Sequence, residues 1–272
     1  MRIGISTALG TDNAKDWALK LAESGCKSAV FPLNCEAEDS LIDEYVDEAK
    51  KNDLMIAEVG IWRNAIAPDE EERKKNLEYS IKQLALADRI GARCCVNVAG
   101  SCGQRWDGGY KGNFSKEMWQ KTVTMVRTVI DEVKPKNTFF TLEPMPWMVP
   151  TGPEEYLKLI EDVARDEFAV HMDIINMING YERFFWHEEF MEKTFDLLGK
   201  KIRSCHIKDV RLLGGFTFQL EECACTEGVF KLEKYAELIN LADQAMPVLI
   251  EHIDDDEKYL EILRRTSQRL KL

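Results

Sequence analysis

Short apolar runs alternate with longer amphipathic segments along the whole chain. Most of the short runs are apolar through their middle, which is typical of parallel strands buried on both faces. The longer segments repeat apolar residues at helical spacing, and several begin with proline or acidic residues that favour a helix start. We predict strands at residues 2–6, 28–31, 55–59, 93–97, 139–143, 170–173, 202–206 and 247–251. We predict helices at residues 13–23, 41–51, 70–90, 116–133, 153–164, 188–198, 232–245 and 256–270.

This alternation predicts an α/β fold of the (β/α)8 TIM barrel type. Eight strand–helix units fit a closed barrel, which typically uses about 250 residues. A doubly wound sheet would carry a glycine fingerprint after an early strand, and the residues after the first predicted strand contain none. No linker, repeat or change of composition divides the chain, so residues 1–272 are expected to form a single barrel domain.

Composition and charge exclude several classes of partner. The chain has 48 acidic and 36 basic residues, a net charge of −12, and no clustered basic patch, so we expect no nucleic-acid partner. No apolar run approaches the ~18 residues of a membrane span, and the first residues lack a secretory signal, so we expect a cytoplasmic protein without a membrane partner. The eight cysteines include no CxxC pair and are expected to be buried free thiols, with the role of Cys223 and Cys225 left open.

Four successive predicted strands, the fifth to the eighth, end in residues that can bind a metal. The carboxyl ends of barrel strands meet at one rim, where active sites form. Three carboxylates and an imidazole buried together would repel strongly without a cation, so the pattern predicts a divalent metal site. The oxygen-rich donor set favours Mn²⁺, with Mg²⁺ or Co²⁺ as alternatives, over a structural zinc ion. The four residues are Glu143, Asp173, His206 and Glu251.

These residues lie in the segments TLEPMPW (141–147), HMDIIN (171–176), SCHIKD (204–209) and LIEHI (249–253). In this ordered series the sequence resembles the xylose isomerase-like superfamily of TIM barrels, specifically its sugar (phosphate) isomerase/epimerase branch, over essentially the whole chain. The resemblance implies that Glu143, Asp173, His206 and Glu251 ligate one catalytic metal, and that Glu143 and Glu251 also act as acid and base on opposite faces of the substrate. The implied activity is a metal-dependent sugar or sugar phosphate isomerase or epimerase, which abstracts a proton next to a carbonyl through a metal-stabilised enediolate.

Two positions depart from the pattern of the family's ketose epimerases. Those enzymes carry a histidine three residues after the metal-binding aspartate, where this chain has Asn176. They carry an arginine six residues after the metal-binding histidine, where this chain has Leu212 beside Arg211. The sequence HIKD (206–209) is more similar to the family's dehydratases and uncharacterised isomerases. The sequences MPW and EHI are similar to catalytic subunits that cleave C-glycosides of oxidised sugars. The alternative function is therefore a metal-dependent lyase, either an inosose-type dehydratase or the catalytic subunit of a C-glycoside deglycosidase acting on 3-keto C-glycosides.

Further residues near the strand ends are expected to contact the substrate. Lys208 follows His206 by two residues, so strand alternation directs both side chains the same way, with a salt bridge to a rim acid as its alternative role. By the same alternation, His252 is expected to point away from the barrel interior. The glycine-rich segment 100–113 is expected to form a mobile lid. The expected substrate-binding residues are Lys208, Asn176, Asn97, Glu58, Trp106, Trp147 and Arg211. The alternative roles are loop capping for Asn97 and Glu58, loop packing for the two tryptophans, and a solvated loop position for Arg211.

The expected partner is a small carbohydrate substrate. The resemblance also favours a homo-oligomer, because dimers and tetramers are usual in the family. A C-glycoside-cleaving enzyme would add a small partner subunit. A non-catalytic sugar-binding barrel is a third alternative, which the intact series of four metal-binding residues disfavours.

Overall fold

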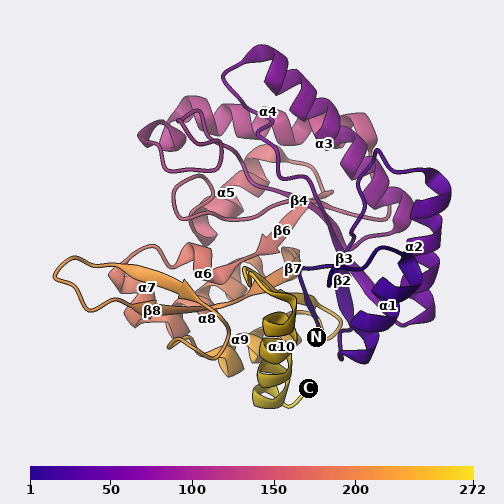
Figure 1. Cartoon of the computed structure of the whole chain (residues 1–272). Helices are drawn as coiled ribbons and strands as arrows, with labels where there is room; N and C mark the ends of the chain where they lie inside the picture. The colour runs from indigo at the N-terminus through magenta and orange to yellow at the C-terminus, as the bar shows by residue number, and fades with distance from the viewer.

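A closed barrel of eight parallel strands forms the centre of the molecule in the computed structural model, which describes residues 1–272 (Figure 1). Every strand pairs in parallel with its two neighbours, and the ring closes between the first and last strands, from the pair Arg2–Pro247 to the pair Ile5–Ile250. The predicted barrel is therefore confirmed. Its strands are β1 (Arg2–Ile5), β2 (Ser28–Val30), β3 (Met55–Gly60), β4 (Cys94–Asn97), β5 (Phe140–Leu142), β6 (Phe168–Met172), β7 (Ile202–Ile207) and β10 (Pro247–Ile250).

Helices surround the barrel, and their starts follow local sequence signals. Asn13, Asp69, Ser115 and Asp255 each accept a hydrogen bond from a backbone N–H three residues further on, which caps a helix. Pro153 is the first residue of its helix, where its missing N–H costs nothing. All eight predicted helices are present. They are α1 (Ala14–Glu23), α2 (Asp39–Lys51), α3 (Glu70–Ile90), α4 (Lys116–Val133), α5 (Pro153–Val163), α8 (His187–Leu198), α9 (Leu232–Ala242) and α10 (Asp256–Leu270).

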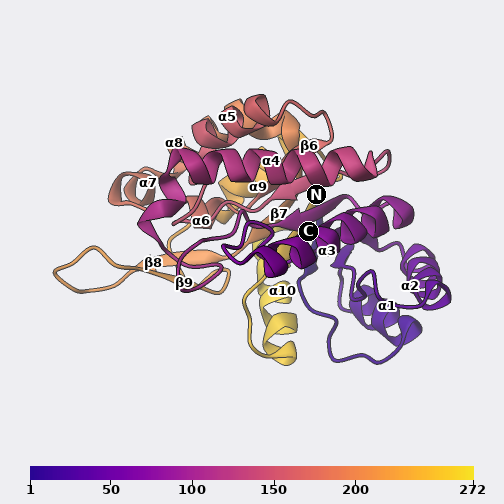
Figure 2. The ribbon, with the colours of Figure 1, turned by 90° about the horizontal axis from the view of Figure 1, so that it is seen from above.

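An antiparallel hairpin that the sequence pattern did not predict follows β7. Its strands, β8 (Asp209–Leu212) and β9 (Leu220–Cys223), extend away from the barrel beyond the surrounding helices (Figures 1 and 2). Both strands are four residues long and mix charged with apolar residues, so they lack the apolar run that marks the barrel strands. Two short helices, α6 (Ile174–Met177) and α7 (Tyr181–Phe185), were also missed. Two 3-10 turns complete the elements, η1 (Lys111–Phe114) and η2 (Gly199–Lys201).

The first two strands approach each other so closely that one of them requires glycine. A Cβ atom on Gly4 would lie 2.0 Å from the carbonyl oxygen of Ser28, which is backbone and cannot move aside. A glycine inside a strand commonly marks such a close approach.

The eight cysteines form no disulfide, as the sequence predicted. Five are buried and three are partly buried. Burial raises the pKa of Cys26 and that of Cys205 to about 12, so these thiols stay protonated. No helix of the structure has both the length and the apolar character that a membrane span requires.

Candidate metal centre and active site

The carboxyl ends of four neighbouring strands bring the predicted metal ligands to one point. Glu143, Asp173 and Glu251 directly follow β5, β6 and β10. His206 is the second-last residue of β7. One donor atom from each of the four residues lies within 4.8 Å of the donor atoms of the other three, and all four residues are buried. The ordered series in the sequence therefore becomes a compact cluster in space.

The surroundings of His206 fit a bound cation. Its Nδ1 atom lies 2.7 Å from Oε2 of Glu251 and 3.7 Å from Oε2 of Glu143, yet it has no hydrogen bond of acceptable geometry although it is buried. On the other side of the ring, Nε2 lies 3.3 Å from Oε1 of Glu58. A proton on Nε2 leaves the Nδ1 lone pair free for a metal and directed among carboxylates. The donors present thus suit a divalent ion that prefers oxygen with some nitrogen.

Lys208 lies among the same carboxylates. Its Nζ atom is 2.6 Å from Oδ2 of Asp173, 2.6 Å from Oε1 of Glu251 and 3.2 Å from Oε2 of Glu222. Only 1% of its side chain is exposed, so these ion pairs are desolvated. Lys208 and His206 do project to the same side, and the rim salt bridge, the alternative role, is the contact that the structure contains.

Burial and neighbouring charges move the pKa values within the cluster in opposite directions. Burial, together with the nearby Glu251, raises the pKa of Glu143 well above its ordinary value. Burial alone would also raise the pKa of Glu251, but His206 and Lys208 outweigh it and hold that pKa well below the ordinary value. Burial would lower the pKa of His206, but Glu251 and Glu58 outweigh it and hold that pKa well above the ordinary value. Two carboxylates in one site are thus driven toward different protonation states.

Two buried tyrosines hold the strand ends that carry the ligands. The Tyr156 hydroxyl, from α5, donates to the carbonyl oxygen of Leu142, the residue before Glu143. The Tyr235 hydroxyl, from α9, lies 3.4 Å from the carbonyl oxygen of Met172 and 3.3 Å from that of His206. These contacts fix the backbone beside three of the four ligands, which limits how far the cluster can relax.

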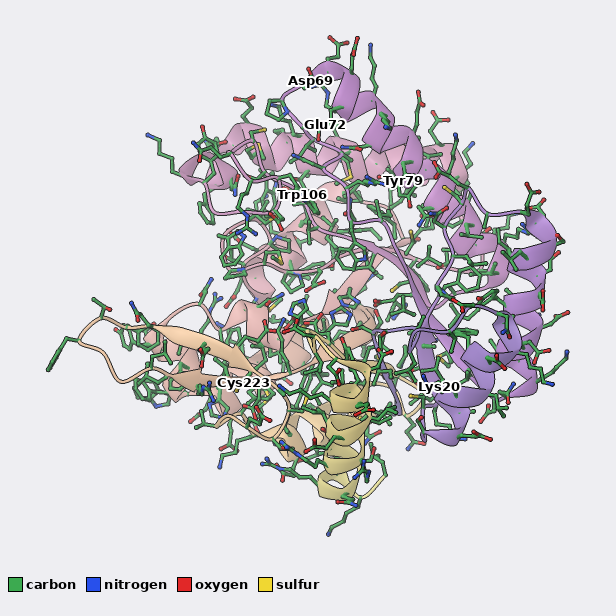
Figure 3. All side chains as sticks on the ribbon, viewed as in Figure 1. Lys20, Asp69, Glu72, Tyr79, Trp106 and Cys223 are labelled. Atoms are coloured by element: carbon green, nitrogen blue, oxygen red, sulfur yellow. The ribbon has the colours of Figure 1, made fainter.

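Most of the predicted substrate-binding residues meet in a cavity of about 480 Å³ above the cluster. Glu143, His206 and Glu251 form part of its wall, together with Glu58, Asn176, Trp106 and Trp147. The amide Nδ2 of Asn176 donates to Oε1 of Glu143 over 2.8 Å. Trp106 comes from the long loop after β4 and is labelled in Figure 3. A cavity of this size with aromatic walls and convergent polar groups suits a small polar ligand.

Three of the seven predicted substrate contacts lie outside the cavity wall: Lys208, which is buried among the carboxylates, and Asn97 and Arg211. Both ends of the Asn97 amide are used by the backbone of Arg63, with Oδ1 accepting over 3.2 Å and Nδ2 donating over 3.0 Å, so Asn97 holds the loop after β3. Arg211 lies on β8 and its Nε atom donates to Glu221 on β9 over 2.6 Å. Neither residue belongs to the wall of the cavity. Each of these two side chains has a partner outside the cavity, and their contact with a substrate stays a prediction.

Among the wall residues that the sequence did not predict are His252 and Glu222, which contact each other. His252 has a φ angle of +56°, so the backbone leaves the extended conformation and the side chain turns toward the cavity. The prediction that it points away is wrong for this reason. Its Nδ1 atom lies 2.7 Å from Oε1 of Glu222, which reaches the cavity from the unpredicted hairpin. Nothing in the sequence marks Glu222, because its position depends on the pairing of the hairpin, which sets Glu222 opposite Val210 near the hairpin base.

A comparison with protein families gives the same fold from the sequence itself. The family model described as xylose isomerase-like TIM barrel matches residues 18–271. The chain belongs to the xylose isomerase-like TIM barrel family. The family match confirms the predicted family. No curated protein matches the sequence.

Solved structures that resemble this xylose isomerase-like barrel include sugar epimerases. A 3-keto-D-glucoside 4-epimerase from E. coli aligns with a TM-score of 0.70 at 16% identity, covering 98% of this chain and 99% of the other. A D-psicose 3-epimerase from Clostridium cellulolyticum H10, solved with D-tagatose, aligns with a TM-score of 0.67 at 16% identity over 100% and 97% of the chains. A xylose isomerase-like protein from Mycobacterium smegmatis in complex with magnesium gives 0.65 at 16% identity over 98% and 94%. At this identity the likenesses establish a shared fold.

Proposed function

We propose that this barrel is a divalent-metal-dependent sugar epimerase or isomerase, which moves a proton at a carbon next to a carbonyl group. The observation that carries the proposal is the convergence of Glu143, Asp173, His206 and Glu251, with donor atoms within 4.8 Å of one another, at the wall of a cavity of about 480 Å³. The sugar epimerases among the structural neighbours support this choice. Mn²⁺ is the ion that best suits the donors, and Mg²⁺, present in one neighbour, is the alternative.

A divalent ion held by these four residues would polarise the substrate carbonyl and acidify the adjacent C–H bond. The two glutamates supply the proton transfers. They come from β5 and β10, which are separated in the barrel by β6 and β7, so their carboxylates reach the cavity from different sides. Glu251, which Lys208 contacts over 2.6 Å, accepts the proton, and Glu143, which reaches the cavity from the other side, returns one.

The neighbours of these glutamates keep the two carboxylates in place. Lys208 holds Glu251 from behind the cluster, and the Asn176 amide holds Glu143 from the cavity side. Return of the proton to the opposite face of the same carbon gives an epimer. Return to the neighbouring carbon interconverts aldose and ketose.

The proposal is tested by incubating the Mn²⁺-loaded protein in deuterium oxide with a panel of ketoses, inososes and 3-keto glycosides. NMR then follows the carbon-bound protons, and mass spectrometry follows the product. We expect deuterium at a carbon next to the carbonyl and a product of the substrate's composition apart from that label. A product that has lost water or an aglycone would replace the epimerase proposal with a lyase.

A further inference from the structure

A second hollow of about 840 Å³ adjoins the cavity of the metal centre and is not used by the proposed reaction. It is formed largely by the loop after β4, with Gln104, Gly109 and Tyr110 in its wall. Arg105 and Trp147 line both hollows. These two side chains therefore stand between the two spaces, and a ligand longer than one sugar ring would reach the second by passing over Trp147.

Trp147 is held in place at this boundary. Its indole Nε1 donates to the carbonyl oxygen of Asp107 over 2.6 Å, and its own carbonyl oxygen accepts a hydrogen bond of 3.0 Å from Nδ2 of Asn113. Asn113 is buried and its Oδ1 accepts a 2.8 Å hydrogen bond from the Ser101 hydroxyl. These contacts connect the tryptophan to both ends of the loop. A ring that stacks on the indole thus meets a surface that is already ordered, which lowers the entropic cost of binding.

The chemistry of the second hollow suits an uncharged, hydroxylated ring. Arg105 is partly neutralised by Asp107, with 3.3 Å between the guanidinium and the carboxylate. The wall residues Gln104 and Tyr110 carry neutral groups that can donate and accept hydrogen bonds, as do the peptide groups of the loop glycines. A phosphate would meet one half-compensated charge, whereas a sugar ring would meet an aromatic face and several neutral polar groups.

We propose that the second hollow binds the second ring of a glycoside, so that the substrates are keto-glycosides. This inference rests on the proposed function. A glycosidic bond removes the carbonyl of the anomeric carbon, so the acidic C–H bond must lie beside a ketone elsewhere in the ring. A reaction that oxidises a secondary ring hydroxyl of a glycoside must therefore supply the substrate.

The test compares binding of two probes to the Mn²⁺-loaded protein by calorimetry, methyl 3-keto-β-D-glucoside with one ring and 3-keto-cellobiose with two. The variant Gly109→Leu fills the second hollow. A Cβ atom on Gly109 lies no closer than 3.6 Å to any atom, at Cβ of Trp147, and its φ is not in the left-handed region, so the backbone accepts a side chain. The matched control is Gly214→Leu at the hairpin tip, where an added Cβ atom meets nothing within 4 Å.

We expect the two-ring probe to bind the wild type and Gly214→Leu about tenfold more tightly than the one-ring probe, which corresponds to about 1.4 kcal/mol. Gly109→Leu should remove this advantage and leave the affinity for the one-ring probe within about twofold. Equal affinities in the wild type, or an advantage that persists in Gly109→Leu, would overturn the inference. If the variant fails to fold, the comparison of the two probes on the wild type still tests the inference.

Deuterium exchange on the same probes separates this inference from the proposed function. Exchange on the one-ring probe without a two-ring advantage refutes the second-ring site and leaves the proton chemistry intact. A two-ring advantage that depends on Gly109, without exchange on either probe, supports the site and refutes the proposed reaction.

Discussion

The ammonium group of Lys208 lies 2.6 Å from Oε1 of Glu251, whose other carboxylate oxygen lies 2.7 Å from Nδ1 of His206. One glutamate thus joins a permanent buried cation to the donor atoms of the metal centre. Lys208 makes an equally short contact of 2.6 Å to Asp173. The lysine therefore compensates the negative charge of two of the four predicted ligands in the metal-free protein.

Lys208→Met should destabilise the metal-free protein by about 3 kcal/mol, because it leaves Asp173 and Glu251 buried without their cation. Mn²⁺ should then raise the unfolding temperature of the variant more than that of the wild type, since the ion replaces the missing positive charge. Differential scanning calorimetry with and without Mn²⁺ measures both effects. Lys74→Met, which removes a lysine with 69% of its side chain exposed, is the control and should change stability by less than about 0.5 kcal/mol. Equal Mn²⁺ shifts in all three proteins would contradict the charge-compensation argument.

Metal affinity should rise with pH. The pKa values of His206 and Glu143 are both raised in the metal-free protein, so these groups retain protons that a metal must displace. Each displaced proton strengthens apparent binding by up to about tenfold per pH unit below the pKa of its group. Calorimetric titration with Mn²⁺ in two buffers of different ionisation enthalpy counts the released protons. Binding that is independent of pH, with no proton release, would show that these groups are not ligands.

Asn176→Ala should lower kcat/KM by about tenfold on a substrate found in the exchange screen. The change removes the 2.8 Å hydrogen bond to Oε1 of Glu143, and such a bond to a reacting group contributes on the order of 1–1.5 kcal/mol. Metal affinity should stay within about threefold, since Asn176 is not a predicted ligand. Asn179→Ala, a nearby exposed amide outside the cavity wall, is the control. An unchanged kcat/KM in Asn176→Ala would mean that the amide does not position Glu143 during the reaction.

Gly4→Ala should destabilise the barrel by about 2 kcal/mol or more, because the new Cβ atom would lie 2.0 Å from the Ser28 carbonyl oxygen and the strands must separate. Urea unfolding measures the change. Gly214→Ala, in open space on the hairpin, should stay within about 0.5 kcal/mol of the wild type. If both variants unfold at the same urea concentration, β1 and β2 do not pack as closely as described.

The sequence predicts the barrel and its four-residue cluster because both depend on regular geometry. Strands buried on both faces have a continuous apolar pattern, and their carboxyl ends meet at one rim whatever the details of the loops. Glu143, Asp173, His206 and Glu251 all sit where a strand ends, so the order of strands alone brings them together.

The positions and contacts that the sequence did not predict occur where this regularity stops. His252 follows a strand, but its left-handed φ of +56° ends the alternation on which the prediction relied. Glu222 reaches the cavity because the pairing of the unpredicted hairpin sets it opposite Val210, near the base of the hairpin. Asn97 ends a strand as expected, but its amide is already bonded to the Arg63 backbone, and no local pattern reveals such a distant partner.

The most direct test of the central claim is metal-dependent exchange of a substrate proton in deuterium oxide, measured by NMR on the wild type and on Glu251→Gln with Mn²⁺ supplied. The predicted result is exchange in the wild type that stops when the metal is chelated and falls by at least about 100-fold in Glu251→Gln, because the amide cannot accept a proton. Exchange that continues unchanged in the variant, or without metal, would contradict the assignment of this cluster as a metal-dependent proton-transfer site.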